Sequence, residues 1–166
     1  MALIVENGTG VANANSYISV SSARVWAASR GASLPAVDTD AEVALIKAMD
    51  FIEALRTRFS GVKTLATQSL QWPRSGASVD GSELEADAIP AELLSAQVQL
   101  AIDAATVDLQ PTGTGQEVLR EKIDVIEVQY AERGSGTVQP QLNKAMAFLE
   151  PLFKNGGFST LRTVRV

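Results

Sequence analysis

Apolar residues recur every three or four positions in four stretches of the chain, the spacing of α-helices that bury one face. These stretches predict helices over 20–30, 40–59, 90–109 and from about 140 to 153. The third also carries a second apolar stripe, which includes Leu93, Leu100 and Val107. Apolar residues on two faces indicate a helix that is contacted from two sides, either inside the fold or against another subunit.

Residues suited to helix ends flank these stretches. Ser19 precedes the first helix as an N-cap, and Gly31 follows it where a left-handed backbone ends many helices. Thr39 and Glu42 have the spacing of a capping box at the second helix. Pro90 suits the first position of the third helix, since proline lacks the N–H that is unpaired there.

The period changes from three or four to two after residue 118, which predicts β-structure. Ile126, Val128 and Tyr130 alternate with polar residues, and 118–123 supplies an antiparallel partner, so we expect a hairpin. A lone hairpin is marginally stable, so it must pack on helices or pair with other strands, including those of another subunit. The apolar segment 2–5 predicts one further strand.

The segment 61–88 has no period and contains several Gly, Ser and Pro residues, which is typical of a long irregular connection. Within it, Trp72, Pro73 and Arg74 join an aromatic ring and a cation to a rigid bend. Such a loop either docks against a neighbouring subunit or packs onto its own core. The sequence leaves both interpretations open.

These elements predict a mainly α fold: a helical bundle with a small β-hairpin and an extended C-terminal tail. We expect one helical domain over 1–153 and a partner-binding tail over 154–166. The tail is apolar and basic, so it is either a disordered chain end or a segment that orders on a partner by adding a strand. Its predicted contact residues are Phe158, Leu161, Arg162, Val164, Arg165 and Val166.

Composition argues against catalysis. The 166 residues are 46% hydrophobic and include neither Cys nor His, so the chain lacks thiolate nucleophiles, the usual zinc ligands and the side chain best suited to proton transfer near neutral pH. No serine lies in a nucleophile-elbow pattern. We therefore expect no enzyme activity, no metal and no cofactor. No apolar run reaches the roughly 20 residues of a membrane span, and the start of the chain lacks the basic flank of a secretion signal, so we expect a protein that is cytosolic during synthesis.

The charge is unevenly distributed. The net charge is −5, but 154–166 carries three cations and no acid, which leaves 11 cations against 19 acids, or −8, in the rest. An acidic body repels nucleic acid at long range. Arg56, Arg58 and Lys63 gather near the predicted end of the second helix, where cations complement the helix dipole.

Four segments occur together in a recognisable order: Asn-Ala-Asn-Ser-Tyr at 13–17, Gln-Ser-Leu-Gln-Trp-Pro-Arg at 68–74, Ile-Pro at 89–90, and the predicted strands over 122–130. As a set they resemble the phage head-tail connector adaptor family, whose members are often labelled DnaT-like single-stranded-DNA-binding proteins. The resemblance covers nearly the whole chain. The hairpin turn departs from it, because Asp124-Val125 stands where relatives often have Gly-Asp.

The resemblance implies a structural virion protein of the head-tail neck that is assembled in the host cytoplasm. It implies a homo-oligomeric ring of about twelve subunits under the portal protein. The tail would bind the portal, the ring would provide the docking site for the next neck, stopper or tail protein, and double-stranded DNA would pass through without specific binding. Candidate subunit-interface residues are Trp72, Pro73, Arg74, Leu93, Leu100, Val107, Ile126, Val128 and Tyr130.

Two alternatives compete with this interpretation. The first is a single-stranded-DNA-binding replication accessory protein, for which Tyr17, Trp72 and Tyr130 are candidate exposed aromatics beside arginines. Stacking alone is insufficient, since such proteins also need a positive groove. The second is a tail-side head-completion or terminator protein, which differs from the adaptor in subunit number.

Overall fold

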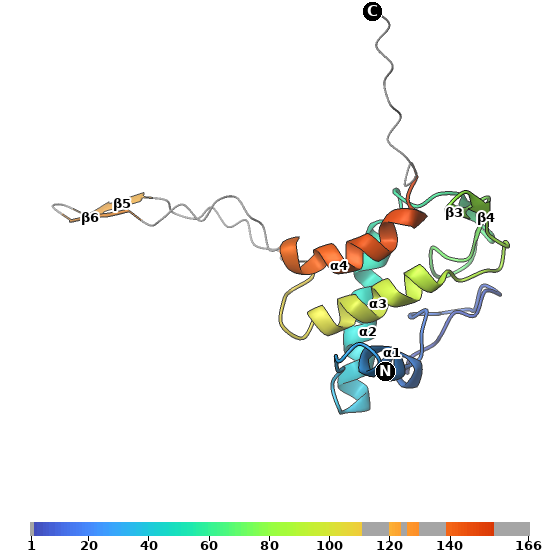
Figure 1. Cartoon of the computed structure of the whole chain (residues 1–166), viewed down its shortest axis with the longest axis horizontal. Coiled ribbons are helices and arrows are strands. Elements are labelled where there is room, and N and C mark those ends of the chain that lie inside the picture. Colours follow the sequence, from blue (N-terminus) through green and yellow to red (C-terminus); the bar gives the residue numbers. More distant parts are fainter. Residues whose placement is uncertain (1, 111–119, 124–125, 130–138, 155–166) are drawn as a thin grey trace, which may run out of the picture.

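The computed structural model describes residues 2–110, 120–123, 126–129 and 139–154. These residues form four α-helices, one 3₁₀-helix and six short strands (Figure 1). In chain order they are α1 (Val20–Ala28), α2 (Asp38–Ala54), β1 (Val62–Lys63), β2 (Arg74–Ser75), β3 (Ser78–Val79), β4 (Ser82–Glu83), α3 (Ala91–Asp103), β5 (Arg120–Ile123), β6 (Ile126–Gln129), α4 (Gln139–Leu149) and η1 (Glu150–Leu152). No helix in these ranges is both long and apolar enough to cross a bilayer.

Helix α1 follows its sequence signals closely. The hydroxyl of Ser19 accepts a hydrogen bond from the backbone N–H of Ser22 at 3.2 Å, so Ser19 is the predicted N-cap. Gly31 has φ +68°, the left-handed conformation that glycine adopts without a steric penalty. Both predictions at the ends of this helix are confirmed.

Helix α2 differs from its prediction at both ends. It begins at Asp38 after Val37, which makes no side-chain cap bond, so the capping box predicted from Thr39 and Glu42 is wrong. It ends at Ala54, five residues before the predicted end at 59. The chain leaves the helix there because Phe59 pairs with Phe153 in an isolated antiparallel bridge and is fully buried. Tertiary contacts therefore override the helical period.

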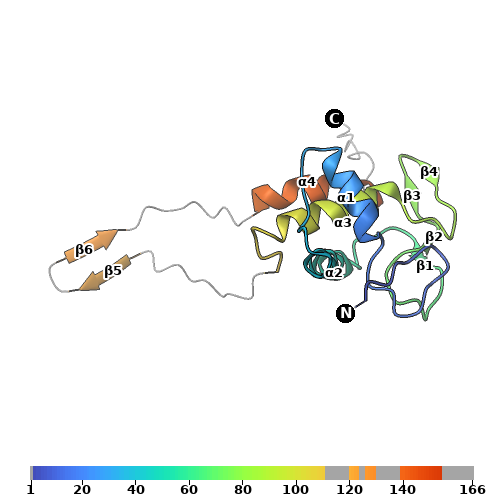
Figure 2. The ribbon, with the colours of Figure 1, turned by 90° about the horizontal axis from the view of Figure 1, so that it is seen from below.

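Helix α3 lies at the centre of the body and contacts α1, α2 and α4, with α4 beside it in Figures 1 and 2. Leu93 and Leu100 on its second stripe are fully buried, so the prediction of a helix contacted from two sides is confirmed. Gln97, also fully buried, joins three segments: its amide oxygen accepts from the N–H of Tyr17, and its amide nitrogen donates to Ser16 Oγ and to the Leu45 carbonyl. These bonds satisfy polar groups that burial would otherwise leave unpaired.

The described fold is a mixture of helices and small antiparallel sheets, so the prediction of a mainly α helical bundle is wrong. Helix α2 is seen end-on in Figure 2 while α3 and α4 lie across the view, whereas bundle helices run nearly parallel. The predicted irregular connection contains two two-stranded sheets, β1–β2 and β3–β4. Its residues Leu70, Trp72 and Ala77 belong to the main hydrophobic core. Core positions in a loop have no helical period, so the pattern could not reveal them.

The predicted β-hairpin is confirmed, because β5 and β6 pair antiparallel with Ile123 opposite Ile126. The predicted strand over 2–5 is wrong. Only Val5 takes part in β-structure there, through an isolated parallel bridge to Ser16. The Ile4 carbonyl instead accepts from the N–H groups of Asn15 and Ser16, which holds this segment against a turn.

Candidate nucleic-acid interface

Tyr17 and Trp72, two of the three aromatics predicted to be exposed for base stacking, are core residues with 3% and 0% exposure. The Tyr17 hydroxyl donates to Glu53 Oε1 at 2.7 Å and accepts from the Trp72 N–H at 3.3 Å. Glu53 also accepts from the Gln71 N–H at 2.9 Å. These bonds fasten the 68–74 loop to α2, so the prediction that Tyr17 and Trp72 are exposed is wrong. Tyr130 lies outside the described residues.

Burial raises the pKa of Tyr17 well above its usual value, and the negative charge of Glu53 raises it further. The folded chain thus keeps this proton where the unfolded chain releases it. The resulting stability is complete below the unfolded pKa of about 10 and is lost as pH rises above it toward the raised pKa, by about 1 kcal/mol at about pH 11. We expect urea unfolding to show this alkaline loss in the wild type and not in Tyr17→Phe. Equal losses in both proteins would contradict the assignment.

Arg74 is also a structural residue. Its guanidinium donates to the carbonyls of Ser60 at 2.6 Å and Gly61 at 2.7 Å, and more weakly to Gln71 at 3.3 Å. Burial lowers the pKa of Arg74. With 6% exposure and its donors engaged, Arg74 offers little to a phosphate group.

The other interface candidates fall into three groups. Trp72 and Pro73 are buried within their own chain, as expected if the loop packs onto its own core. Leu93 and Leu100 are also buried, where α3 packs against the other helices. Val107 is half-buried. Ile126 and Val128 lie in β6, and the six predicted tail residues lie outside the described ranges. Contacts of these residues with another subunit stay a prediction.

A hollow of about 550 Å³ opens where α2 faces the chain after α3. Lys47 and Asp50 line it from α2, and residues 104 and 106–110, which include Val107, line it from the other side. Asp108 adds a second acid. The mixed charge makes this hollow a poor site for a polyanion.

Three exposed cations follow the ends of two helices, Arg56 and Arg58 after α2 and Lys154 after η1; we call these three residues the basic end. The Lys154 N–H donates to the Arg58 carbonyl at 2.7 Å, and the Ser60 N–H donates to the Leu152 carbonyl at 2.9 Å. This pairing places Arg58 opposite Lys154 across the bridge between Phe59 and Phe153. Like charges directly opposite each other destabilise a strand pair. A bound anion would offset that repulsion.

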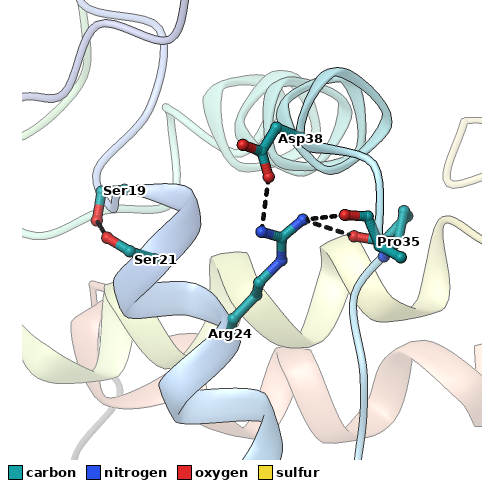
Figure 3. A network of polar contacts seen from close by, with 6 residues as sticks. Ser19, Ser21, Arg24, Pro35 and Asp38 are labelled. Atoms are coloured by element: carbon teal, nitrogen blue, oxygen red, sulfur yellow. Dashed lines mark hydrogen bonds and ion pairs between the residues drawn. The ribbon is translucent and has the colours of Figure 1, made fainter.

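The ring of Phe153 lies beneath Arg58, whose guanidinium carbon is 4.0 Å from the ring centroid. A cation over an aromatic face is held in place without losing its charge. Within the described residues the one ion pair joins Arg24 and Asp38, at 2.6 Å, so no carboxylate there is bridged to the basic end. Figure 3 shows Arg24 pointing at Asp38 and at the Pro35 carbonyl. Arg24 donates a hydrogen bond to each of them, so its guanidinium is occupied within its own chain.

The sequence could not reveal this cluster. The sequence pattern places Arg56 and Arg58 at the end of the second helix, where they would complement its dipole, but α2 ends at Ala54 and has no basic residue in its last turn. The same pattern places Lys154 in the separate tail. Only the bridge between Phe59 and Phe153, residues 94 positions apart, brings the cations together.

One family model matches residues 1–166, the whole chain, and its description is "Putative DnaT-like ssDNA binding protein". The chain belongs to this family. No curated protein and no solved structure matches it.

Membership in the DnaT-like family corrects the resemblance drawn from the sequence. The family description names single-stranded DNA binding, so the identification as a phage head-tail connector adaptor is wrong, and with it the virion, neck and portal-binding role. The match favours the first alternative, a protein that binds single-stranded DNA. A single chain does not test three further predictions, which stay predictions: the subunit ring, the place in the cell and the absence of enzyme activity.

Proposed function

We propose that this DnaT-like protein binds single-stranded DNA as a non-catalytic replication accessory, with phosphates of the strand held at the basic end. Family membership supports the ligand class. The observation that carries the site is the placement of Arg58 opposite Lys154, both exposed and joined to no carboxylate by an ion pair within the described residues. Two opposed cations suit the closely spaced charges of a nucleic-acid backbone.

The position of the basic end adds to this argument. Lys154 begins the acid-free segment 154–166, which also contains Arg162 and Arg165. The bridge between Phe59 and Phe153 sets Arg58 opposite the first cation of this segment, Lys154. The basic end therefore adds arginines of the folded body to the cations of 154–166, which bears on the need for a positive surface.

Salt dependence tests the proposal quantitatively. The three cations of the basic end, together with Arg162 and Arg165, make five possible contacts with phosphates. Five contacts would give a slope of log K against log salt of about −3.5, because each neutralised phosphate of a single strand contributes about −0.7. We expect Arg58→Gln with Lys154→Gln to reduce the slope by about 1.4 and to weaken binding about tenfold. Fluorescence anisotropy of a labelled oligo-dT of about 20 nucleotides, at several salt concentrations, measures both quantities.

A matched control has the same change in net charge. Lys47 and Lys144 are exposed cations on α2 and α4, so Lys47→Gln with Lys144→Gln should leave the slope within about 0.3 of the wild type. No binding by the wild type at low salt, or equal losses in the two double variants, would refute the proposed site.

A further inference from the structure

Trp26, on α1, is fixed in position but only half-buried. Its indole Nε1–H donates to Ser95 Oγ on α3 at 3.1 Å. Its ring also meets the Phe148 ring of α4 edge to face, with centroids 6.1 Å apart. The indole is therefore held from two neighbouring helices. A ring fixed in this way loses little conformational freedom when a ligand stacks on it.

One face of this indole is covered by a cation and not by the core. The guanidinium carbon of Arg30 lies 3.8 Å from the ring centroid, and Arg30 is exposed. Its Nη1 donates to the Trp26 carbonyl at 3.3 Å and to Ser29 Oγ at 3.0 Å, both neutral acceptors. A planar guanidinium in this position marks a face on which another flat group can stack.

The segment of the chain that contains Trp26 has no acidic residue. No Asp or Glu occurs from Asn7 to Val37, although the chain has 19 acidic residues. This segment has two cations, Arg24 and Arg30. Arg24 forms an ion pair with Asp38, whereas Arg30 has no ion-pair partner among the described residues. Next to Trp26, Val25 is 72% exposed and Ser29 is also exposed, so small or apolar side chains flank the ring. A phosphate near Arg30 would meet no carboxylate from this segment.

We propose that Trp26 and Arg30 form a stacking site for one unpaired nucleobase. The base stacks on the indole face that Arg30 covers in the free protein, and the guanidinium moves to a neighbouring phosphate. A paired base cannot present its face in this way, so the site selects single strands over duplex. This inference rests on the proposed function and assigns the aromatic contact that the buried Tyr17 and Trp72 cannot make.

The stacking site is joined to the basic end by a short continuous segment. Phe148, in α4, contacts Trp26, and Phe153, directly after η1, lies beneath Arg58. The two phenylalanines are five residues apart, so their Cα atoms are at most about 18 Å apart. One strand can then contact both sites, with a base on Trp26 and phosphates on the cations.

Tryptophan fluorescence tests this inference on the unmodified protein. Trp26 and Trp72 are the two tryptophans of the chain, and Trp72 is fully buried, so quenching by DNA reports on Trp26. We expect oligo-dT to quench the emission and an abasic oligonucleotide of equal length to bind without quenching. Loss of a stacked base should make Trp26→Leu bind oligo-dT about 5- to 100-fold more weakly, while Trp26→Phe stays within about threefold of the wild type. For the abasic strand, Trp26→Leu and the wild type should bind equally.

The outcomes separate the two proposals. Anisotropy that shows no binding of either strand by the wild type overturns the proposed function. Oligo-dT binding without quenching, or a Trp26→Leu variant that is weakened equally for oligo-dT and for the abasic strand, overturns the stacking site alone. Circular dichroism and thermal unfolding of Trp26→Phe, which keeps the contact with Phe148, check that the fold is retained.

Discussion

Replacing Trp72 with alanine is expected to lower the free energy of unfolding by about 3–5 kcal/mol. The substitution removes the largest fully buried side chain and leaves a cavity in its place. The ring packs against Phe59 in a T-shaped pair with centroids 5.9 Å apart. For a chain of this length the loss corresponds to a fall in melting temperature of about 6–20 °C. Urea and thermal unfolding followed by circular dichroism measure it.

Trp72→Phe is the matched control. The indole Nε1 has no hydrogen-bond partner among the described residues, so phenylalanine loses volume without breaking such a bond. We expect less than half of the alanine effect, and unchanged oligo-dT affinity. An alanine variant as stable as the wild type would show that Trp72 does not fill the core.

Replacing Glu6 with alanine is the second large effect. The Glu6 carboxylate is 2% exposed and accepts four backbone N–H groups, from Asn7 at 3.1 Å, Gly8 and Gly10 at 2.9 Å, and Val11 at 2.8 Å. Removing this acceptor leaves the donors of a tightly folded loop unpaired. We expect a loss of at least about 3 kcal/mol in the free energy of unfolding, measured by urea unfolding.

Two variants test the cause of this loss. Glu6→Gln keeps one acceptor oxygen and should retain the three bonds that share it, so its loss should be smaller, about 1–3 kcal/mol. Glu85→Ala removes an exposed carboxylate and should change stability by less than about 0.5 kcal/mol. Equal effects of Glu6→Ala and Glu85→Ala would mean that the loop does not depend on the carboxylate.

The loop that contains Trp72 affects the proposed DNA-binding site indirectly, through core packing. Phe59 contacts both Trp72, at 5.9 Å, and Phe153, at 5.4 Å between ring centroids, and its backbone pairs with that of Phe153. The same bridge sets Arg58 opposite Lys154. Trp72 therefore supports the geometry of the basic end without contacting DNA. Its role is to position Phe59, and not to stack on a base as its aromatic side chain predicts.

Several local features follow from the sequence pattern alone. The Ser19 cap, the left-handed Gly31, the two-sided α3 and the alternation of the β5–β6 hairpin each follow from short-range spacing, and all are present. These features depend on residues a few positions apart, so a period or a cap residue predicts them. The capping box of Thr39 and Glu42 fails because α2 begins earlier, at Asp38.

The burial of particular side chains and the meeting of particular charges depend on the tertiary fold. Whether Tyr17 and Trp72 stack on DNA or fill the core depends on Glu53, 36 positions from Tyr17, and on Phe59, which lies outside the 68–74 loop that contains Trp72. The early end of α2 and the meeting of Arg58 with Lys154 both follow from one bridge across 94 positions. Contacts at such separations depend on how the whole core packs, which no local pattern encodes.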